Sequence, residues 1–137
     1  MTDVAASRGL LRFHHGGVSV PDLEEAIGWY GDVLGFRLDR RFAVPGAEVA
    51  YVERDGLRIE LFEAEGAAPL PDARRHPRTD LMTHGHKHLA FATEDYDRFR
   101  ADLVARGIEV ILDVGESFGR AFFIRDNSGN VIEFVEV

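Results

Sequence analysis

The feature of this sequence that most constrains its fold is an internal repeat with a fixed spacing of 73 residues. The first copy contains HHGGVSVPDLEEAIGWYGDVLGF and DGLRIELFE, and the second contains KHLAFATEDYDRFRADLVARGI and SGNVIEFVE. The matched positions are His15 and His88, Gly56 and Gly129, Ile59 and Ile132, and Glu60 and Glu133. A register kept over so many positions indicates two copies of one supersecondary unit.

Each copy is expected to form a βαβββ module, which makes the chain an α+β protein. In the first module, residues 11–63, a strand over 13–20 ends at Pro21, and Asp22 with Glu25 forms a capping box for a helix that Gly35 ends. Later strands are expected over 49–54 and 57–62, joined by an Asp55-Gly56 hairpin turn.

The second module, residues 83–137, repeats this order. A strand over 87–93 leads to a helix that Asp95 caps and Gly107 stops, with Tyr96, Phe99 and Leu103 on its buried stripe. Strands are then expected over 109–113, 121–125 and 131–135, with a turn at 127–129.

The linker between the modules, residues 64–82, has three of the five prolines and no apolar periodicity. Because loops longer than about 12 residues in compact domains are often functional, two interpretations stay open. The linker is either a plain crossover or a segment that closes over a site.

Composition limits the classes of function. The 137 residues suit one domain, 1–137, and a hydrophobic fraction of 45% with 29% charged residues is typical of a packed globular protein. Sixteen basic and 24 acidic residues give a net charge of −8, which argues against nucleic acid as a partner. Without a signal-peptide pattern or a long apolar stretch, the chain is expected to be cytoplasmic and to have no membrane contact.

Two histidines and two glutamates do not fit a plain core. The chain has no cysteine, so a metal would need His, Asp or Glu ligands. Glu133 shares a strand face with Val131 and Val135, and a partly buried carboxylate there is costly unless it is paired or binds a metal. The strand face around Glu60 is less apolar, so burial is a weaker argument there. The hypothesis that Glu60 is a site residue rests on its equivalence to Glu133 in the repeat.

The two histidine strands leave space beside the imidazole. His15 shares its face with Gly17 and Ser19, and His88 shares its face with Ala90 and Ala92. Small neighbours of this kind leave room for a substrate. The other histidines receive less weight: His84 and His86 for want of a partner in the first module, His14 because alternation places it on the opposite face from His15, and His76 because it lies in the linker.

At these residues the sequence resembles the vicinal oxygen chelate superfamily, which includes glyoxalase I, methylmalonyl-CoA epimerase, extradiol dioxygenases and antibiotic-resistance proteins. The resemblance runs from about Leu11 to Val137 and is carried by residues 15–36, RIELFE, KHLAFAT and DNSGNVIEFVE. It implies two βαβββ modules paired into a curved, cup-like mixed sheet. It also implies that His15, Glu60, His88 and Glu133 are metal ligands.

The resemblance further implies a metal-dependent lyase or isomerase, similar to glyoxalase I, that chelates adjacent substrate oxygens while Glu133 or Glu60 moves a proton on the neighbouring carbon. Three alternatives stay open: an Fe(II) extradiol-type dioxygenase with Glu60 unligated, a thiol transferase acting on an antibiotic, and a metal-free binding protein. The donor set does not distinguish Zn, Ni, Co, Mn and Fe. A homodimer is expected, with the site built from one chain or shared between two.

Overall fold

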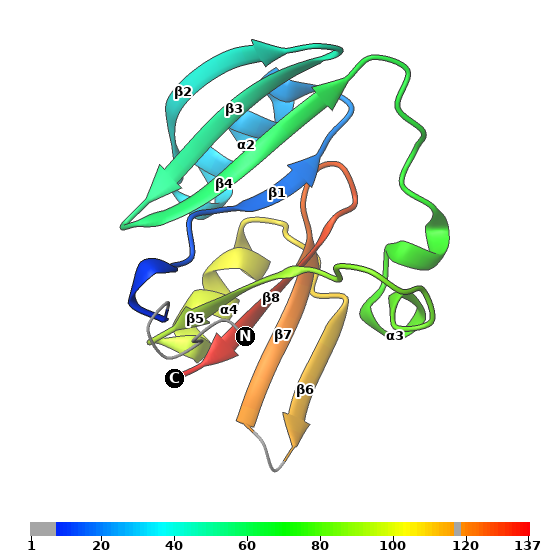
Figure 1. The fold of residues 1–137 in the computed structure, drawn as a ribbon. Helices are drawn as coiled ribbons and strands as arrows, with labels where there is room; N and C mark the ends of the chain where they lie inside the picture. Colours follow the sequence, from blue (N-terminus) through cyan, green and yellow to red (C-terminus); the bar gives the residue numbers. More distant parts are fainter. Residues whose placement is uncertain (1–7, 117–118) are drawn as a thin grey trace, which may run out of the picture.

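The computed structural model describes residues 8–116 and 119–137. It contains two four-stranded mixed sheets, each with a helix against one face (Figure 1). The first sheet has the order β1-β4-β3-β2, and the second has the corresponding order β5-β8-β7-β6. The two βαβββ modules and the α+β class are thus confirmed, and within the described residues the two sheets are not joined by a strand ladder.

The first module begins, after the short 3-10 helix η1 (Arg8–Leu10), with β1 (Gly16–Ser19) and α2 (Leu23–Leu34). Three antiparallel strands follow: β2 (Arg37–Val44), β3 (Ala47–Arg54) and β4 (Leu57–Ala64). The helix has the predicted ends, because Asp22 accepts a hydrogen bond from the Glu25 amide (3.0 Å) and Gly35 has φ 75°. Gly56 in the β3–β4 turn has φ 82°, the left-handed region where glycine is favoured.

The second module repeats this path with β5 (Leu89–Thr93), α4 (Tyr96–Ala105), β6 (Leu112–Glu116), β7 (Gly119–Arg125) and β8 (Val131–Glu136). In both modules the first strand runs parallel to the last, so Gly17 pairs with Glu60 and Ala90 pairs with Glu133. Asp95 lies at the N-cap of α4, as expected, although its side chain makes no capping hydrogen bond.

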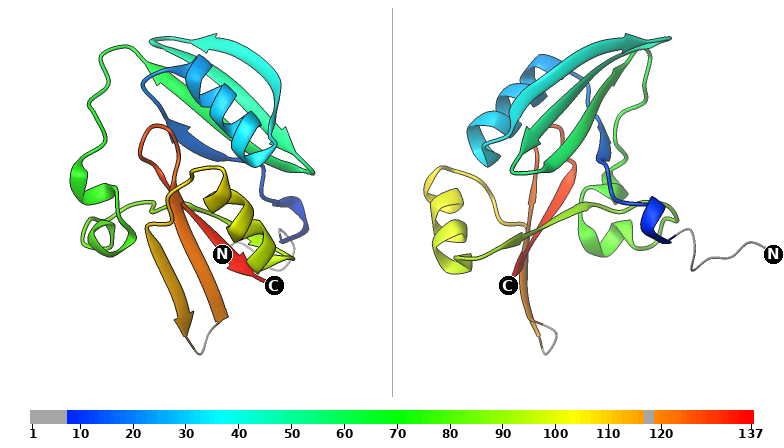
Figure 2. Two further views of the ribbon diagram at one scale, coloured as in Figure 1. Left: turned by 180° about the vertical axis from the view of Figure 1, so that it is seen from behind. Right: turned by 60° about the vertical axis from the view of Figure 1, so that its left-hand side comes forward.

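The two modules share one hydrophobic core. Figure 2 shows α2 and α4 on the same side of the molecule. Phe36 and Phe91 join the modules with ring centroids 5.9 Å apart. The approach between β1 and the start of β5 is close, since a Cβ added to Gly16 would lie 2.5 Å from Leu89 Cδ2. Packing of this density fixes how the two histidine strands lie relative to each other.

The linker has more structure than its sequence predicted. It contains the 3-10 helix η2 (Asp72–Arg74) and a single helical turn, α3 (Pro77–Asp80). Asp80 is 2% exposed and binds Arg74 Nε (3.0 Å) and Lys87 Nζ (3.3 Å). This ionic cluster holds the linker to the start of β5, and an apolar-periodicity argument does not detect a segment held by charge.

Several predicted boundaries were wrong. The first strand begins at Gly16 instead of residue 13, β5 begins at Leu89 instead of 87, and β6 covers Leu112–Glu116 instead of 109–113. The strand β2 was missed because its side chains are exposed along almost the whole strand, so it has no apolar alternation. Within residues 8–116 and 119–137, no helix is both long and apolar enough to cross a membrane.

Candidate functional site

The predicted site residues form two His–Glu pairs, one in each module. His15 Nε2 lies 3.1 Å from Glu60 Oε1, and His88 Nε2 lies 2.9 Å from Glu133 Oε1. The parallel pairing of the first and last strands of each module produces this arrangement. Each histidine lies just before the first strand, and the second residue of that strand pairs with the glutamate on the last strand. All four side chains are between 14% and 29% exposed, so solvent reaches the pairs.

Each pair packs against an aromatic ring that the sequence analysis did not single out. The ring of Tyr51 lies 5.4 Å from that of His15, and the ring of Phe123 lies 5.2 Å from that of His88, both edge to face. Tyr51 pairs with Glu60 across β3 and β4, and Phe123 pairs with Glu133 across β7 and β8. The repeat hid this equivalence because the two hairpin turns differ in length, so the rings are 72 residues apart instead of 73.

His14 lies beside His15, not on the opposite face as strand alternation predicted. The Nδ1 atoms of the two rings are 2.7 Å apart, and Arg58 Nη1 lies 2.9 Å from His14 Nε2. The alternation rule does not apply here, because β1 begins only at Gly16. Since a guanidinium only donates, a neutral His14 accepts at Nε2 and donates from Nδ1 to His15, which then donates from Nε2 to Glu60.

His76, the linker histidine given little weight as a site residue, caps a helical turn. Its Nδ1 accepts a hydrogen bond from the backbone amide of Arg78 (3.2 Å) at the start of α3. His76 therefore has a local structural role.

The donor atoms suit a divalent metal ion. Two ligands bound at right angles and about 2.1 Å from one ion are roughly 3 Å apart, close to the separation in each pair. Imidazole nitrogen and carboxylate oxygen are donors for several first-row divalent ions. Binding at Nε2 requires the proton of each imidazole on Nδ1. The Nδ1 atom of His88 is buried without a hydrogen-bond partner in the described part of the chain, whereas Nδ1 of His15 lies against His14, so a metal at His15 would require the contacts of His14 with His15 and Arg58 to rearrange.

The two pairs do not form a single four-residue centre within one chain. Among residues 8–116 and 119–137, no group of three or more His, Asp or Glu side chains is arranged to hold a metal ion. The structure therefore brings His15 to Glu60 and His88 to Glu133, and it leaves these two pairs separate.

A cleft of about 1260 Å³ lies between the modules. His15 and His88 line it. Of the four small residues predicted to leave space beside the imidazoles, Gly17, Ser19 and Ala90 line the cleft and Ala92 does not. The linker forms another part of the wall. Cavities of this kind hold small molecules, so the two histidines face a volume suited to a ligand.

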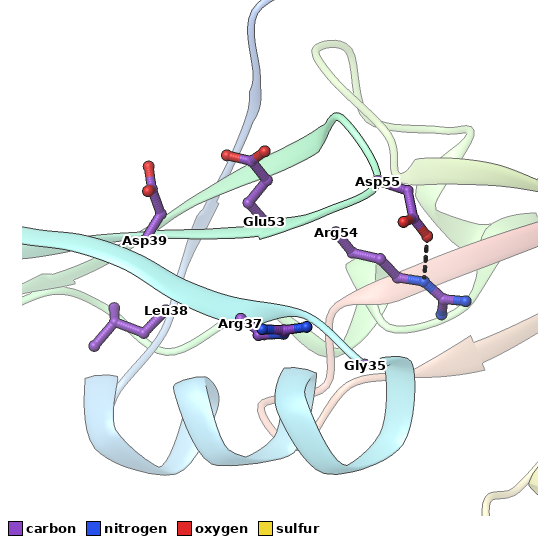
Figure 3. Close-up of a pocket in the computed structure, with 7 residues that line it drawn as sticks. All are labelled: Gly35, Arg37, Leu38, Asp39, Glu53, Arg54 and Asp55. Carbon is purple, nitrogen blue, oxygen red and sulfur yellow. Dashed lines mark hydrogen bonds and ion pairs between the residues drawn. The ribbon is translucent and has the colours of Figure 1, made fainter.

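A second hollow, of about 560 Å³, lies where α2 ends against β2 and β3 (Figure 3). Its walls carry charges of both signs: Arg37 and Arg54 with Asp39, Glu53 and Asp55. Arg54 binds Asp55 (3.3 Å) and the carbonyl oxygen of Leu34 (2.6 Å). These opposite charges largely compensate one another, so the larger cleft is the better candidate site.

Comparisons with known proteins agree with this fold. A family model described as the Glyoxalase/Bleomycin resistance protein/Dioxygenase superfamily matches residues 12–134. A glyoxalase family protein from Enterococcus faecalis superposes with a TM-score of 0.75 at 22% identity, over 91% of this chain and 97% of that chain.

Two other similar structures illustrate different activities on this fold. One is a variant of the fosfomycin resistance protein FosX from Listeria monocytogenes with Mn(II) and a dihydroxypropylphosphonic acid; its TM-score is 0.67 at 16% identity, over 91% of both chains. The other is an antibiotic binding protein from a Streptomyces species, with a TM-score of 0.63 at 22% identity, over 91% of this chain and 96% of that chain. At these identities the likeness concerns the fold.

Proposed function

The chain belongs to the glyoxalase/bleomycin resistance protein/dioxygenase superfamily, and we propose that it is a metal-dependent, glyoxalase-like lyase or isomerase. The observation that carries this proposal is the pair of matched His–Glu contacts, His15 with Glu60 and His88 with Glu133, whose donor separations are 3.1 and 2.9 Å. Both histidines of one chain line the same cleft, so a small molecule in it can reach either pair.

The metal ligands are proposed to come from two copies of the chain. Because the two pairs do not form one cluster within the described residues, a centre with all four ligands needs the first-module pair of one copy beside the second-module pair of another. A two-fold dimer would repeat this contact and produce two such centres. The homodimer is therefore part of the proposal.

A divalent ion held by His15, Glu60, His88 and Glu133 would supply Lewis acidity to a substrate oxygen. The residues of the protein would transfer a proton between two neighbouring carbons of the substrate. The Glu133 or Glu60 carboxylate takes a proton from the carbon beside the substrate carbonyl, and an enediolate-type intermediate results. The same carboxyl returns the proton to the neighbouring carbon, so the reaction needs no oxidant or reductant.

The first test measures metal content. We expect stoichiometric divalent metal in the parent protein and its loss in His15→Ala and His88→Ala, while His84→Ala, which changes an exposed histidine outside the pairs, keeps the metal. Full metal retention in both folded site variants would overturn the ligand assignment.

The second test asks whether two chains share the centre. In a mixture of His15→Ala and His88→Ala chains, each heterodimer contains one intact centre and one centre that lacks both histidines. Random exchange should then restore metal to about one quarter of the sites, because half of the dimers are mixed. If each chain holds its own metal, mixing restores none.

A binding protein without metal is the second candidate. It is favoured by the separation of the two pairs in one chain, together with a cleft large enough for a small molecule. This candidate requires ligand binding without turnover and no effect of His15→Ala on metal content. The same metal analysis therefore distinguishes the two candidates.

A further inference from the structure

The cleft is lined by positive charge although the chain has a net charge of −8. Among the described residues that line it, those that can carry a positive charge are Arg58, Arg74, Arg75, Lys87, His15, His86 and His88. No Asp or Glu in the described part of the chain contributes to this wall. A low-dielectric cleft lined by one sign of charge concentrates ligands of the opposite sign.

The excess of positive charge is located at the linker. Arg74 and Lys87 share one carboxylate, that of Asp80. Arg125 lies against the same segment, because its Nε donates to the carbonyl oxygen of Arg75 (2.6 Å). Two cations thus share one buried acid, and two more, Arg75 and Arg125, lie on or against the same segment. Lys87 directly precedes His88, so this cluster is at the same end of β5 as one of the His–Glu pairs.

Arg75 is the member of the cluster best placed to bind an anion. Its Nε donates to the carbonyl oxygen of Leu70 (3.3 Å), which fixes the guanidinium plane. The Nη groups of the Arg75 guanidinium lie over the β7–β8 turn, where a Cβ on Gly129 would be 3.0 Å from Nη1. In the part of the chain that the structure describes, Arg75 has one ion-pair partner, Asp72, which lies 3.7 Å from Nε and is fully exposed to solvent.

The Nη groups of Arg75 have no hydrogen-bond partner within residues 8–116 and 119–137, and they are the atoms that bind an oxyanion in bidentate geometry. Ser128 and Asn130 line the cleft on either side of Gly129 and add neutral polar groups to the same wall.

We propose that the cleft binds molecules that carry an oxyanion, a carboxylate or a phosphate, and that Arg75 binds this group. The inference deepens the proposed function, since it specifies an anionic class of substrate for the same cleft. The linker then has a binding role: it carries Arg75, and the Asp80 cluster holds it in position.

The test uses the whole, metal-free protein, with inorganic phosphate and succinate as separate probes and calorimetry as the readout. We expect saturable binding of at least one probe, which weakens as ionic strength rises. Arg75→Gln should weaken it about tenfold or more, since a charged hydrogen bond contributes about 1.5–3 kcal/mol. Arg75→Lys should retain part of the affinity, because it keeps the charge and loses the fork.

Arg78→Gln is the matched control: this arginine is exposed, belongs to the same linker and does not line the cleft. Equal loss in Arg78→Gln and Arg75→Gln, unchanged affinity in a folded Arg75→Gln, or no binding of either probe by the parent would each overturn the proposal. Preferential binding of phosphate or of succinate identifies which oxyanion the site suits. Because no metal is present, the outcome is independent of the metal analysis that tests the proposed function.

Discussion

Tyr30 in α2 donates a hydrogen bond of 2.8 Å to Asp126, which lies in the turn between β7 and β8 of the other module. Both residues are buried, and Asp126 also accepts hydrogen bonds from the backbone amides of Ser128 (2.8 Å) and Asn130 (2.9 Å). Burial, and then the neighbouring Asp126 carboxylate, raise the pKa of Tyr30 well above its usual value, so its hydroxyl remains a donor at neutral pH. One side chain therefore both orders this turn and joins it to α2.

The first prediction concerns this contact. Tyr30→Phe keeps the ring but removes the donor to a buried carboxylate, so the free energy of unfolding should fall by about 1.5–3 kcal/mol. Urea denaturation measures the change. Tyr96→Phe is the control, because Tyr96 is also a tyrosine with little exposed surface but its hydroxyl has no hydrogen-bond partner in the described residues; it should change stability by less than about 0.5 kcal/mol. An equal loss in both variants would contradict a specific role for the Tyr30 hydroxyl.

The second prediction concerns the ionic cluster in the linker. Burial would raise the pKa of Asp80, but hydrogen bonds and charges from Arg74 and Lys87 outweigh burial and hold it below its usual value. A carboxyl whose pKa is lower in the folded state stabilises the fold fully above its unfolded pKa, about 3.9, and loses this effect as the pH falls through its folded pKa.

Asp80→Asn should therefore lower the free energy of unfolding at pH 7 by about 1.5–3 kcal/mol, and the difference from the parent should shrink as the pH falls below about 3.9. Denaturant titrations of both proteins between pH 3 and pH 7 measure it. Asp72→Asn is a control in the same linker, since its side chain is fully exposed. A difference that is constant over this range would exclude an effect of the Asp80 charge.

Much of each module could be predicted from local chemistry. The sequence predicts both ends of helix α2, because a capping box begins at Asp22 and a glycine lies at residue 35. The strand β2 was missed because an exposed edge strand has no apolar period. The repeat also predicted that each module holds one histidine near its start and one glutamate near its end, 45 residues apart in both copies.

The arrangement between modules could not be predicted in the same way. A repeat describes each unit but not the angle at which two units pack, so it did not predict that the two His–Glu pairs remain separate in one chain. Arg75 has no periodic pattern or repeat partner. Its place in the cleft wall depends on the folded linker, which the Asp80 cluster holds by charge.

The third prediction concerns assembly. If two copies share each metal centre, sedimentation at micromolar concentration should show a dimer, and dilution below the dimer dissociation constant should release metal as the monomer forms. Retention of stoichiometric metal by a monomeric species would rule out the shared centre, and the ligand assignment itself would then depend on the variants alone.

The last prediction separates the roles of the two glutamates. Glutamine keeps a carbonyl oxygen that can bind a metal but is a poor base. For a proton-transfer enzyme, Glu60→Gln and Glu133→Gln should each retain metal better than turnover, and the variant that lacks the base should lose about 10²–10⁴-fold in kcat. Glu109→Gln, at an exposed position outside both pairs, is the matched control and should retain both. Metal content and incorporation of solvent deuterium into hemithioacetal or 2-hydroxy ketone substrates are the two measurements.

A proton-transfer mechanism requires exchange at the carbon beside the carbonyl in the parent enzyme. Full activity and metal in Glu60→Gln, with loss of both in Glu133→Gln and no exchange in the parent, would instead indicate a three-ligand centre in which Glu60 takes no part, because a residue that neither binds the metal nor moves the proton can be changed without cost.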